Sequence, residues 1–293
     1  MLAFSAFCLC TSPSLTKRGE NRDLLVAAER HYYQSVKLLR LSLAAVEDID
    51  ADVVLACGIV LIPCGLALVC RDDDKGVSPL QDWLYHLRGW RPIGASIYGP
   101  SGHLDAASTK LIPYPQPGIP ETRDLPARRA DGNEHWPSSI PFLRTFRHSW
   151  LEAMARLKGA TGSHCNQSVA AADLHTTYIS AITALERVMD YILTYPVTNL
   201  FRAVFIWPIQ VPPEFIQLLA EHDDLASAIY AHWLVMTMTL EDLWWLRGFG
   251  SGQIERIAER AASFGSSGFD LLAWPVEMLD EWRCCGRTGQ IEL

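Results

Sequence analysis

Apolar residues recur every three to four positions along most of this chain, which is the spacing of one face of an α-helix. In residues 20–46 that face carries Leu25, Ala28, Tyr32, Val36, Leu39 and Leu43. In residues 167–193 it carries Leu174, Tyr178, Ile182, Leu185, Met189 and Ile192. Further helices are predicted to start at Ser78, to run near Phe142–Lys158, to start at Pro212 and to cover residues 254–261. No segment alternates as a strand does, so the pattern predicts an all-α fold of about eight helices.

Two stretches have no charged residue and are predicted to be interior helices. The first, VVLACGIVLIPCGLALVC, covers residues 53–70 and contains Pro63. A membrane span needs about 20 apolar residues, so we interpret this stretch as a kinked, buried helix of a core. The second is predicted to run from Leu225 to Leu246 and to stop at Gly248, and it has no charged residue from 225 to 240. A helix that is apolar on most sides lies in the centre of a core or in a membrane, and its His232 favours the core.

Prolines divide the chain into three parts. Residues 98–141 contain eight prolines among 44 residues, which indicates a long loop or insertion. Residues 1–97 and 142–293 are then predicted to be the N-terminal and C-terminal helices of one domain. The opening MLAFSAFCLC has no preceding basic residue, so we expect it to belong to the core and not to a signal peptide.

Composition excludes several classes of function. The 293 residues carry a net charge of -8 and no basic stripe, so direct nucleic-acid binding by this chain is not expected. The eight cysteines form no CxxC pair, which favours reduced thiols over a zinc site or a disulfide framework. We therefore predict no metal and no cofactor.

One stretch raises an enzymatic alternative. DDLASAIYA, residues 223–231, is a near match to the second metal motif of class I terpene cyclases, which hold magnesium at the mouth of an aromatic pocket. Asp223, Asp224, Leu225 and Ser227 match the motif, but Ala231 replaces its final Glu. Losing a carboxylate removes both charge and a ligand from a hard cation. Asp72, Asp73 and Asp74 form a second acidic run, which lacks the spacing of the first motif. A magnesium-dependent cyclase is the alternative to a non-enzymatic protein.

Five blocks of the sequence carry a family resemblance. They are AERHYYQSVKLLRLSL, DADVVLACGIVLIPCGLAL, DWLYHLRGW, FIWPIQVPPEFIQLLAEHDDLASAIYAHWLVMTMTLEDLWWLRGFG and LLAWPVEML. In this order they resemble the C-terminal regulatory domain of fungal zinc-cluster transcription factors, and especially the sterol uptake control proteins. The resemblance covers about residues 2–282, and residues 205–250 are its most specific part.

The resemblance implies an α-helical regulatory domain with an apolar pocket, no enzymatic activity and a location in the nucleus or cytoplasm. Its expected partners are an apolar small molecule such as a sterol and other transcription or transport proteins. Members of the family also carry a module of six cysteines that binds DNA, which this chain lacks, so we expect a truncated chain, a fragment or a relative without the module. A helical domain that has degenerated to a structural role is a further alternative.

Four residues are predicted to line a ligand pocket. Trp233, Met236, Leu240 and Trp244 lie at steps of three and four residues on the predicted apolar helix. A sterol-sized pocket has apolar and aromatic walls. Plain core packing gives the same spacing, so both interpretations stay open.

Overall fold

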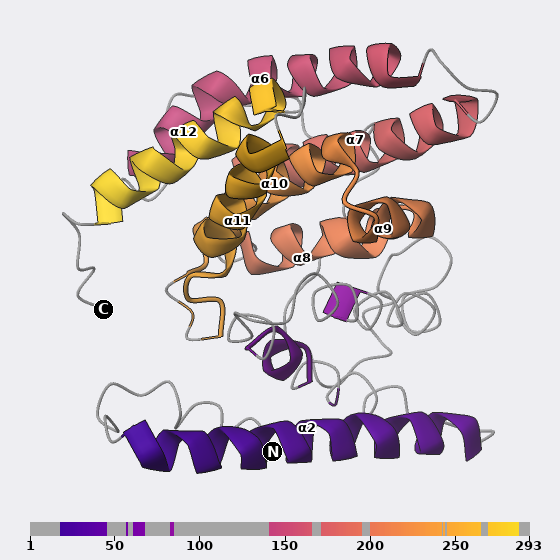
Figure 1. The fold of residues 1–293 in the computed structure, drawn as a ribbon, viewed down its shortest axis with the longest axis vertical. Helices are drawn as coiled ribbons and strands as arrows, with labels where there is room; N and C mark the ends of the chain where they lie inside the picture. The colour runs from indigo at the N-terminus through magenta and orange to yellow at the C-terminus, as the bar shows by residue number, and fades with distance from the viewer. Residues whose placement is uncertain are drawn as a thin grey trace. The chain divides into compact units, whose positions relative to one another are not determined.

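The described part of the computed structural model is helical throughout its regular structure, which confirms the all-α prediction (Figure 1). The structure describes residues 18–45, 57, 61–67, 83–84, 141–165, 171–194, 200–241, 243, 245–264 and 269–286. Contacts divide the chain into two compact units, Met1–Ala130 with Leu243–Leu246, and Asp131–Asp242 with Arg247–Leu293. The opening ten residues, the acidic run at 72–74, the helix start at Ser78 and the proline-rich segment up to residue 140 lie outside the described residues.

The described part of the N-terminal unit contains α2, Arg18–Ala45, where the sequence predicts a helix over 20–46. Ala28 and Tyr32 of its apolar face are buried. Residues 61–67 are helical, and Leu61, Cys64, Leu66 and Ala67 are buried, so the prediction of a buried helix is confirmed for these residues.

Gly65 allows a close approach of α2 and Trp83 to this short helix. A Cβ atom at Gly65 would lie 2.6 Å from the Tyr32 hydroxyl oxygen and 3.1 Å from Cδ1 of Trp83. The Trp83 indole N–H also donates to the Ile62 carbonyl at 3.3 Å. Among the described helices, none combines the length and the apolar character needed to cross a membrane.

The C-terminal unit is built around one central helix (Figure 1). Its helices are α6 Pro141–Cys165, α7 Ala171–Thr194, α8 Leu200–Gln210, α9 Pro213–Ala220, α10 Asp224–Met238, α11 Phe249–Phe264 and α12 Phe269–Gly286. α10 contacts each of the other six. All of its residues from Leu225 to Met238 are buried, which confirms the predicted interior helix for this range.

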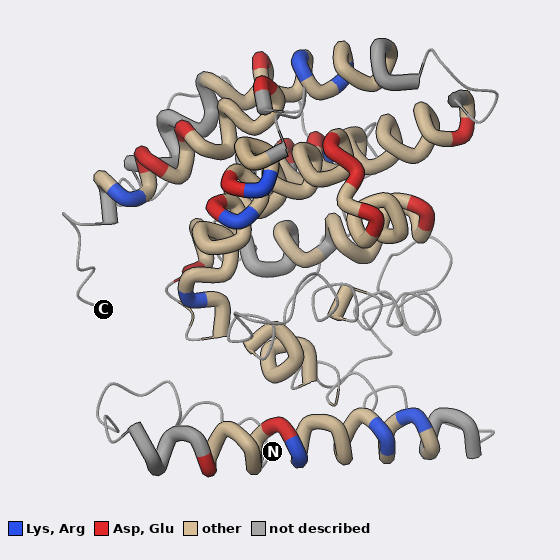
Figure 2. The backbone as a smooth tube through the Cα atoms, in the orientation of Figure 1, with Lys and Arg blue, Asp and Glu red and all other residues tan. Residues whose placement is uncertain are grey.

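The start of α10 is fixed by a side-chain cap. Asp223 precedes the helix, and its Oδ1 accepts a hydrogen bond from the Ala226 N–H at 2.8 Å. A cap of this kind satisfies one of the N–H groups that have no partner in the first turn. Asp224 in the first turn is the charged residue of α10, and the rest of the helix is uncharged (Figure 2).

The prediction that this helix continues to Leu246 is wrong, because α10 ends at Met238. The Thr239 hydroxyl donates to the Met236 carbonyl at 2.6 Å, and the Leu240 N–H donates to the Thr237 carbonyl at 2.9 Å. These three-residue bonds tighten the last turn and end the helix. Gly248 has a φ of 71°, as expected for a turn, but the rest of GFGSG begins α11 and is not part of the turn.

Two helices were not predicted from the sequence, α8 and α12, and each contains an internal proline, Pro208 and Pro275. Proline removes a backbone donor and disfavours a helix interior, so the pattern around it indicates a break. A buried tryptophan precedes each proline. The Trp207 indole N–H donates to the Ala181 carbonyl at 2.9 Å, and the Trp274 indole N–H donates to the Ser149 hydroxyl at 2.6 Å. Tertiary packing at these anchors outweighs the local preference.

A close approach between α10 and α11 gives a stability prediction at Gly250. A Cβ atom there would lie 2.4 Å from Oγ1 of Thr237 and 2.7 Å from the Leu234 carbonyl oxygen. We expect Gly250→Ala to lower the free energy of unfolding by about 1–3 kcal/mol, the usual cost of overpacking, in a urea titration.

Gly252 provides the matched control, because it lies in the same helix and a Cβ atom there would meet nothing within 4 Å. Gly252→Ala should raise stability by up to about 1 kcal/mol through helix propensity alone. Equal effects of the two substitutions would contradict the tight crossing of α10 and α11.

Candidate functional site

Six aromatic side chains gather at the centre of the C-terminal unit, and we call them the aromatic cluster. They come from α8, α9, α10 and α11 and are Phe205, Trp207, Phe215, Tyr230, Trp233 and Phe249. The Trp233 ring stacks on Trp207 with centroids 5.3 Å apart and on Tyr230 at 5.5 Å. Phe205 and Phe249 meet Trp233 edge-on, at 6.5 Å and 6.2 Å. Offset stacking and edge contacts are the favoured geometries of aromatic pairs.

The polar atoms of the two tryptophans are satisfied inside the cluster. The Trp233 indole N–H donates to the Val204 carbonyl at 2.8 Å, and Trp207 donates to the Ala181 carbonyl. Because both acceptors are backbone carbonyls, each bond fixes a ring against a neighbouring helix. The surfaces of these two indoles that the neighbouring side chains contact are therefore apolar, because neither indole N–H is left without an acceptor.

The structure places the four predicted pocket residues differently from one another. Trp233 and Met236 are buried in α10, as predicted for an inward face, but so is every residue from 225 to 238. Leu240 is buried in the turn after α10, so it does not continue the helix face. Trp244 lies outside the described residues. The arrangement thus brings Trp233 and Met236 together on one helix and places Leu240 just beyond its end.

Sequence periodicity missed the α8 part of the cluster. Phe205 and Trp207 belong to FIWPIQ, where Pro208 indicates a break, and Phe215 belongs to α9. The usable signal was the density of aromatic residues between 201 and 249, since aromatic side chains dominate buried area.

The cyclase-like stretch forms a polar cluster of another kind. Asp223 is the α10 cap, and Ser227 Oγ accepts a hydrogen bond from Nη2 of Arg260 in α11 at 3.3 Å. The Arg260 guanidinium also donates to Nδ1 of His222, whose backbone has a φ of 61°. Partial burial lowers the pKa of His222, and the charge of Arg260 lowers it further.

A guanidinium at this position disfavours a magnesium ion. The positively charged Arg260 guanidinium donates a hydrogen bond to Ser227, one of the matched ligand positions, and its charge also interacts with Asp224. A divalent cation would have to overcome this repulsion without the missing carboxylate at Ala231. Within the described residues, no group of three or more His, Cys, Asp or Glu side chains is placed to hold a metal.

His232 is a buried histidine packed between helices. Its Nδ1 lies 2.8 Å from the Ala228 carbonyl, so the proton is assigned to Nδ1, and its ring stacks on Trp274 with centroids 5.0 Å apart. Trp274 in turn meets Trp150 edge-on at 5.4 Å. Burial lowers the pKa of His232 to about 4, the Ala228 carbonyl opposes the shift, and the nearby charge of Arg156 adds to it. His232 is therefore neutral at physiological pH and joins α10 to α12.

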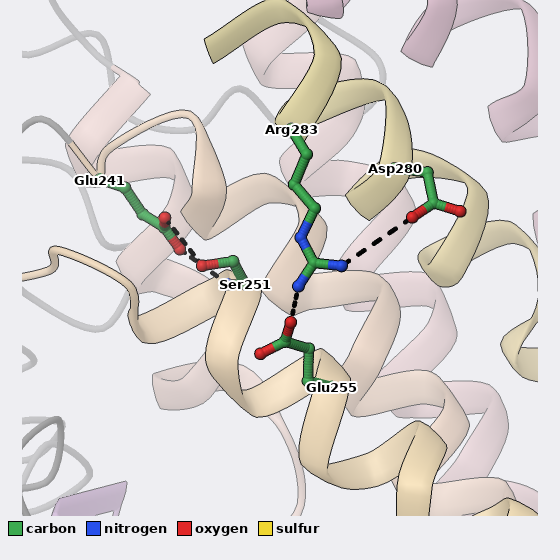
Figure 3. A network of polar contacts seen from close by, with 5 residues as sticks. All are labelled: Glu241, Ser251, Glu255, Asp280 and Arg283. Carbon is green, nitrogen blue, oxygen red and sulfur yellow. Dashed lines mark hydrogen bonds and ion pairs between the residues drawn. The ribbon is translucent and has the colours of Figure 1, made fainter. Parts of the chain in front are cut away.

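Glu241 holds the turn after α10 against the start of α11 (Figure 3). Its Oε1 accepts from the Ser251 N–H at 2.7 Å, and its Oε2 accepts from the Ser251 hydroxyl at 3.0 Å. Burial raises the pKa of this carboxyl, while hydrogen bonds from Ser251 and from the N–H groups of Gly248 and Gly250 oppose the shift. Glu241 thus caps α11 from outside the helix.

A separate ion-pair group joins α11 to α12 (Figure 3). Arg283 pairs with Glu255 of α11 and lies 4.0 Å from Asp280 of its own helix. All three side chains are well exposed, so the contribution to stability is about 0–1 kcal/mol.

Comparisons of this chain with protein-family models, with curated proteins and with solved structures give no match.

The His232 environment predicts a loss of stability in acid. The unfolded chain binds a proton near pH 6.5, whereas the folded chain resists protonation down to about pH 4. Stability from this group is complete above pH 6.5 and is lost as the pH falls from 6.5 towards 4, by roughly 3 kcal/mol. Urea titrations of the wild type and His232→Phe should show that the variant lacks this part of the pH dependence. The exposed His175 supplies the control His175→Gln, which should keep it.

Glu241 predicts a pH dependence of opposite sign. The pKa of Glu241 in the folded chain is raised above the ordinary value of 4.5. Its contribution to the free energy of unfolding is therefore complete below pH 4.5 and declines as the pH rises through the folded pKa. As the pH rises over this range, the wild type should lose this part of its unfolding free energy, whereas Glu241→Gln, which has no carboxyl to titrate, should not. The stability of the variant relative to the wild type should therefore increase with pH. A difference independent of pH would show that the carboxyl is not desolvated.

Proposed function

We propose that this chain is a helical regulatory domain of the kind found in fungal zinc-cluster transcription factors, and that it responds to an apolar small molecule such as a sterol. The observation that supports the proposal is the position of the most specific block of the resemblance. Residues 205–250 supply all six members of the aromatic cluster, and they also contain the whole of the central helix α10. The expected location is the nucleus or cytoplasm, and the expected partners are other transcription or transport proteins.

The proposed ligand contacts Met236, in the last turn of α10, and Leu240, in the turn that follows the helix. The Trp233 ring contacts four aromatic rings of the cluster, and its indole N–H donates to the Val204 carbonyl. Moving Trp233 would therefore break several contacts at once. Met236 has a flexible, polarisable side chain, which adapts to a bound group. Leu240 lies where the helix has ended and the chain turns. Rearrangement of this turn would transmit binding to Glu241 and the start of α11.

The two alternatives make different demands. A cyclase needs magnesium at the 223–231 stretch, where Arg260 already donates to Ser227, and the regulatory proposal needs no metal there. A degenerate structural domain needs no ligand at all. Binding of an apolar compound therefore separates the proposal from a structural role, and turnover of a diphosphate separates it from a cyclase.

Ligand binding is tested by thermal unfolding of the full chain with a panel of sterols. A compound present at 100 times its dissociation constant should stabilise the folded state by about 2.7 kcal/mol. Leu240→Asn should weaken the affinity measured by tryptophan fluorescence by about tenfold or more, since it places an amide in the apolar wall.

Leu151 supplies the matched control, because it is exposed on α6 and Leu151→Asn makes the same chemical change outside the core. That variant should bind as the wild type does. No stabilisation by any sterol would contradict the proposal. Release of diphosphate from farnesyl diphosphate with magnesium would favour the cyclase instead.

A further inference from the structure

The outer face of α2 exposes an unusual amount of apolar surface. Within the described residues, six large hydrophobic side chains are exposed, and four of them lie on this one helix. The exposed fractions are 55% for Val26, 60% for Tyr33, 64% for Leu38 and 56% for Leu41. Scattered single exposures are normal on a protein surface, but a concentration on one helix indicates a contact surface.

Three exposed basic side chains lie among these apolar residues. Val26, Arg30, Tyr33, Lys37 and Leu41 follow one another at steps of 4, 3, 4 and 4, so they form one stripe along the helix, and Arg40 borders it. In the part of the chain that the structure describes, none of the three cations is in an ion pair. Among the acids of α2 whose side chains the structure describes, Asp23 is exposed and Glu29 is half-buried. The basic positions along α2 are seen in Figure 2.

We propose that this stripe, residues 26–41 of α2, docks an acidic amphipathic helix of a partner protein. The two kinds of residue alternate along the stripe, so the partner helix needs apolar residues at steps of three and four with Glu or Asp between them. Each carboxylate would then meet Arg30, Lys37 or Arg40, while the apolar residues cover Val26, Tyr33 and Leu41. The chain as a whole has a net charge of -8, so the basic stripe differs in sign from the chain's overall charge. Charge complementarity at such a stripe favours an acidic partner over a basic one.

The same alternation disfavours two other occupants. A helix that lies on a membrane needs a continuous apolar face with its cations on the polar side, whereas Arg30 and Lys37 lie within the apolar stripe itself. A second copy of α2 would bring the three cations of one copy against those of the other, which costs energy through like-charge repulsion.

The test measures binding of two synthetic helical peptides to the full chain by fluorescence anisotropy. Both peptides have leucine at steps of three and four, and one has glutamate and the other lysine at the intervening positions. The glutamate peptide should bind about tenfold or more tightly, and raising the salt concentration should weaken it. Equal binding of the two peptides, or no binding of the glutamate peptide, would overturn the proposal.

Charge reversal locates the contact. Arg30→Glu with Lys37→Glu should invert the preference to the lysine peptide, and both substitutions keep good helix formers in place. Arg187→Glu with Arg247→Glu makes the same change of charge at exposed positions elsewhere and should leave the preference unchanged. Circular dichroism checks that each variant is folded. If the double variant of α2 does not fold, Tyr33→Ser, at an exposed position, should weaken binding of the glutamate peptide instead.

Two further measurements distinguish the other occupants. Binding of the wild type, but not of the α2 variant, to vesicles of phosphatidylserine and phosphatidylcholine would assign the stripe to a membrane and overturn the proposal. A dimer of the wild type in analytical ultracentrifugation that the α2 variant does not form would assign it to a second copy and would also overturn it.

Discussion

The C-terminal unit depends on the enclosure of one uncharged helix. α10 has no Asp, Glu, Lys or Arg from Leu225 to its end at Met238, so no side of it can face water without exposing apolar surface. Six helices surround it, and all of its residues from 225 to 238 are buried. The positions of α6, α7, α8, α9, α11 and α12 follow from this constraint, because each covers part of the same helix.

Tryptophan side chains convert this non-directional burial into a defined arrangement. The indoles of Trp207, Trp233 and Trp274 each donate one hydrogen bond, to Ala181, Val204 and Ser149 respectively. A buried donor without a partner costs about 1–3 kcal/mol, so each bond disfavours helix positions that would break it. Burial alone would allow α10 to rotate among its neighbours, and these bonds together with the close approach at Gly250 select one packing.

The sequence predicted what periodicity and charge determine. The all-α class, α2 and the interior character of α10 follow from apolar spacing and from the absence of charge. Periodicity failed where tertiary contacts decide. Pro208 and Pro275 indicated breaks in helices that buried tryptophans sustain, and the local hydroxyl bond of Thr239 ended α10 where the apolar pattern continued. For the same reason the four residues predicted to line a pocket do not share one helix face: Trp233 and Met236 lie in α10, but Leu240 follows its end. Phe205 and Trp207 of the aromatic cluster come from α8, a helix that the pattern did not show.

Native-state hydrogen exchange tests the enclosure of α10 most directly. Peptides covering residues 224–238 should be among the slowest to exchange in the chain and should exchange only through global unfolding, with the same free energy as urea denaturation. α2, which has an exposed outer face, should exchange earlier. Exchange of α10 as fast as that of α2, under conditions where the chain is folded, would contradict the central position of this helix.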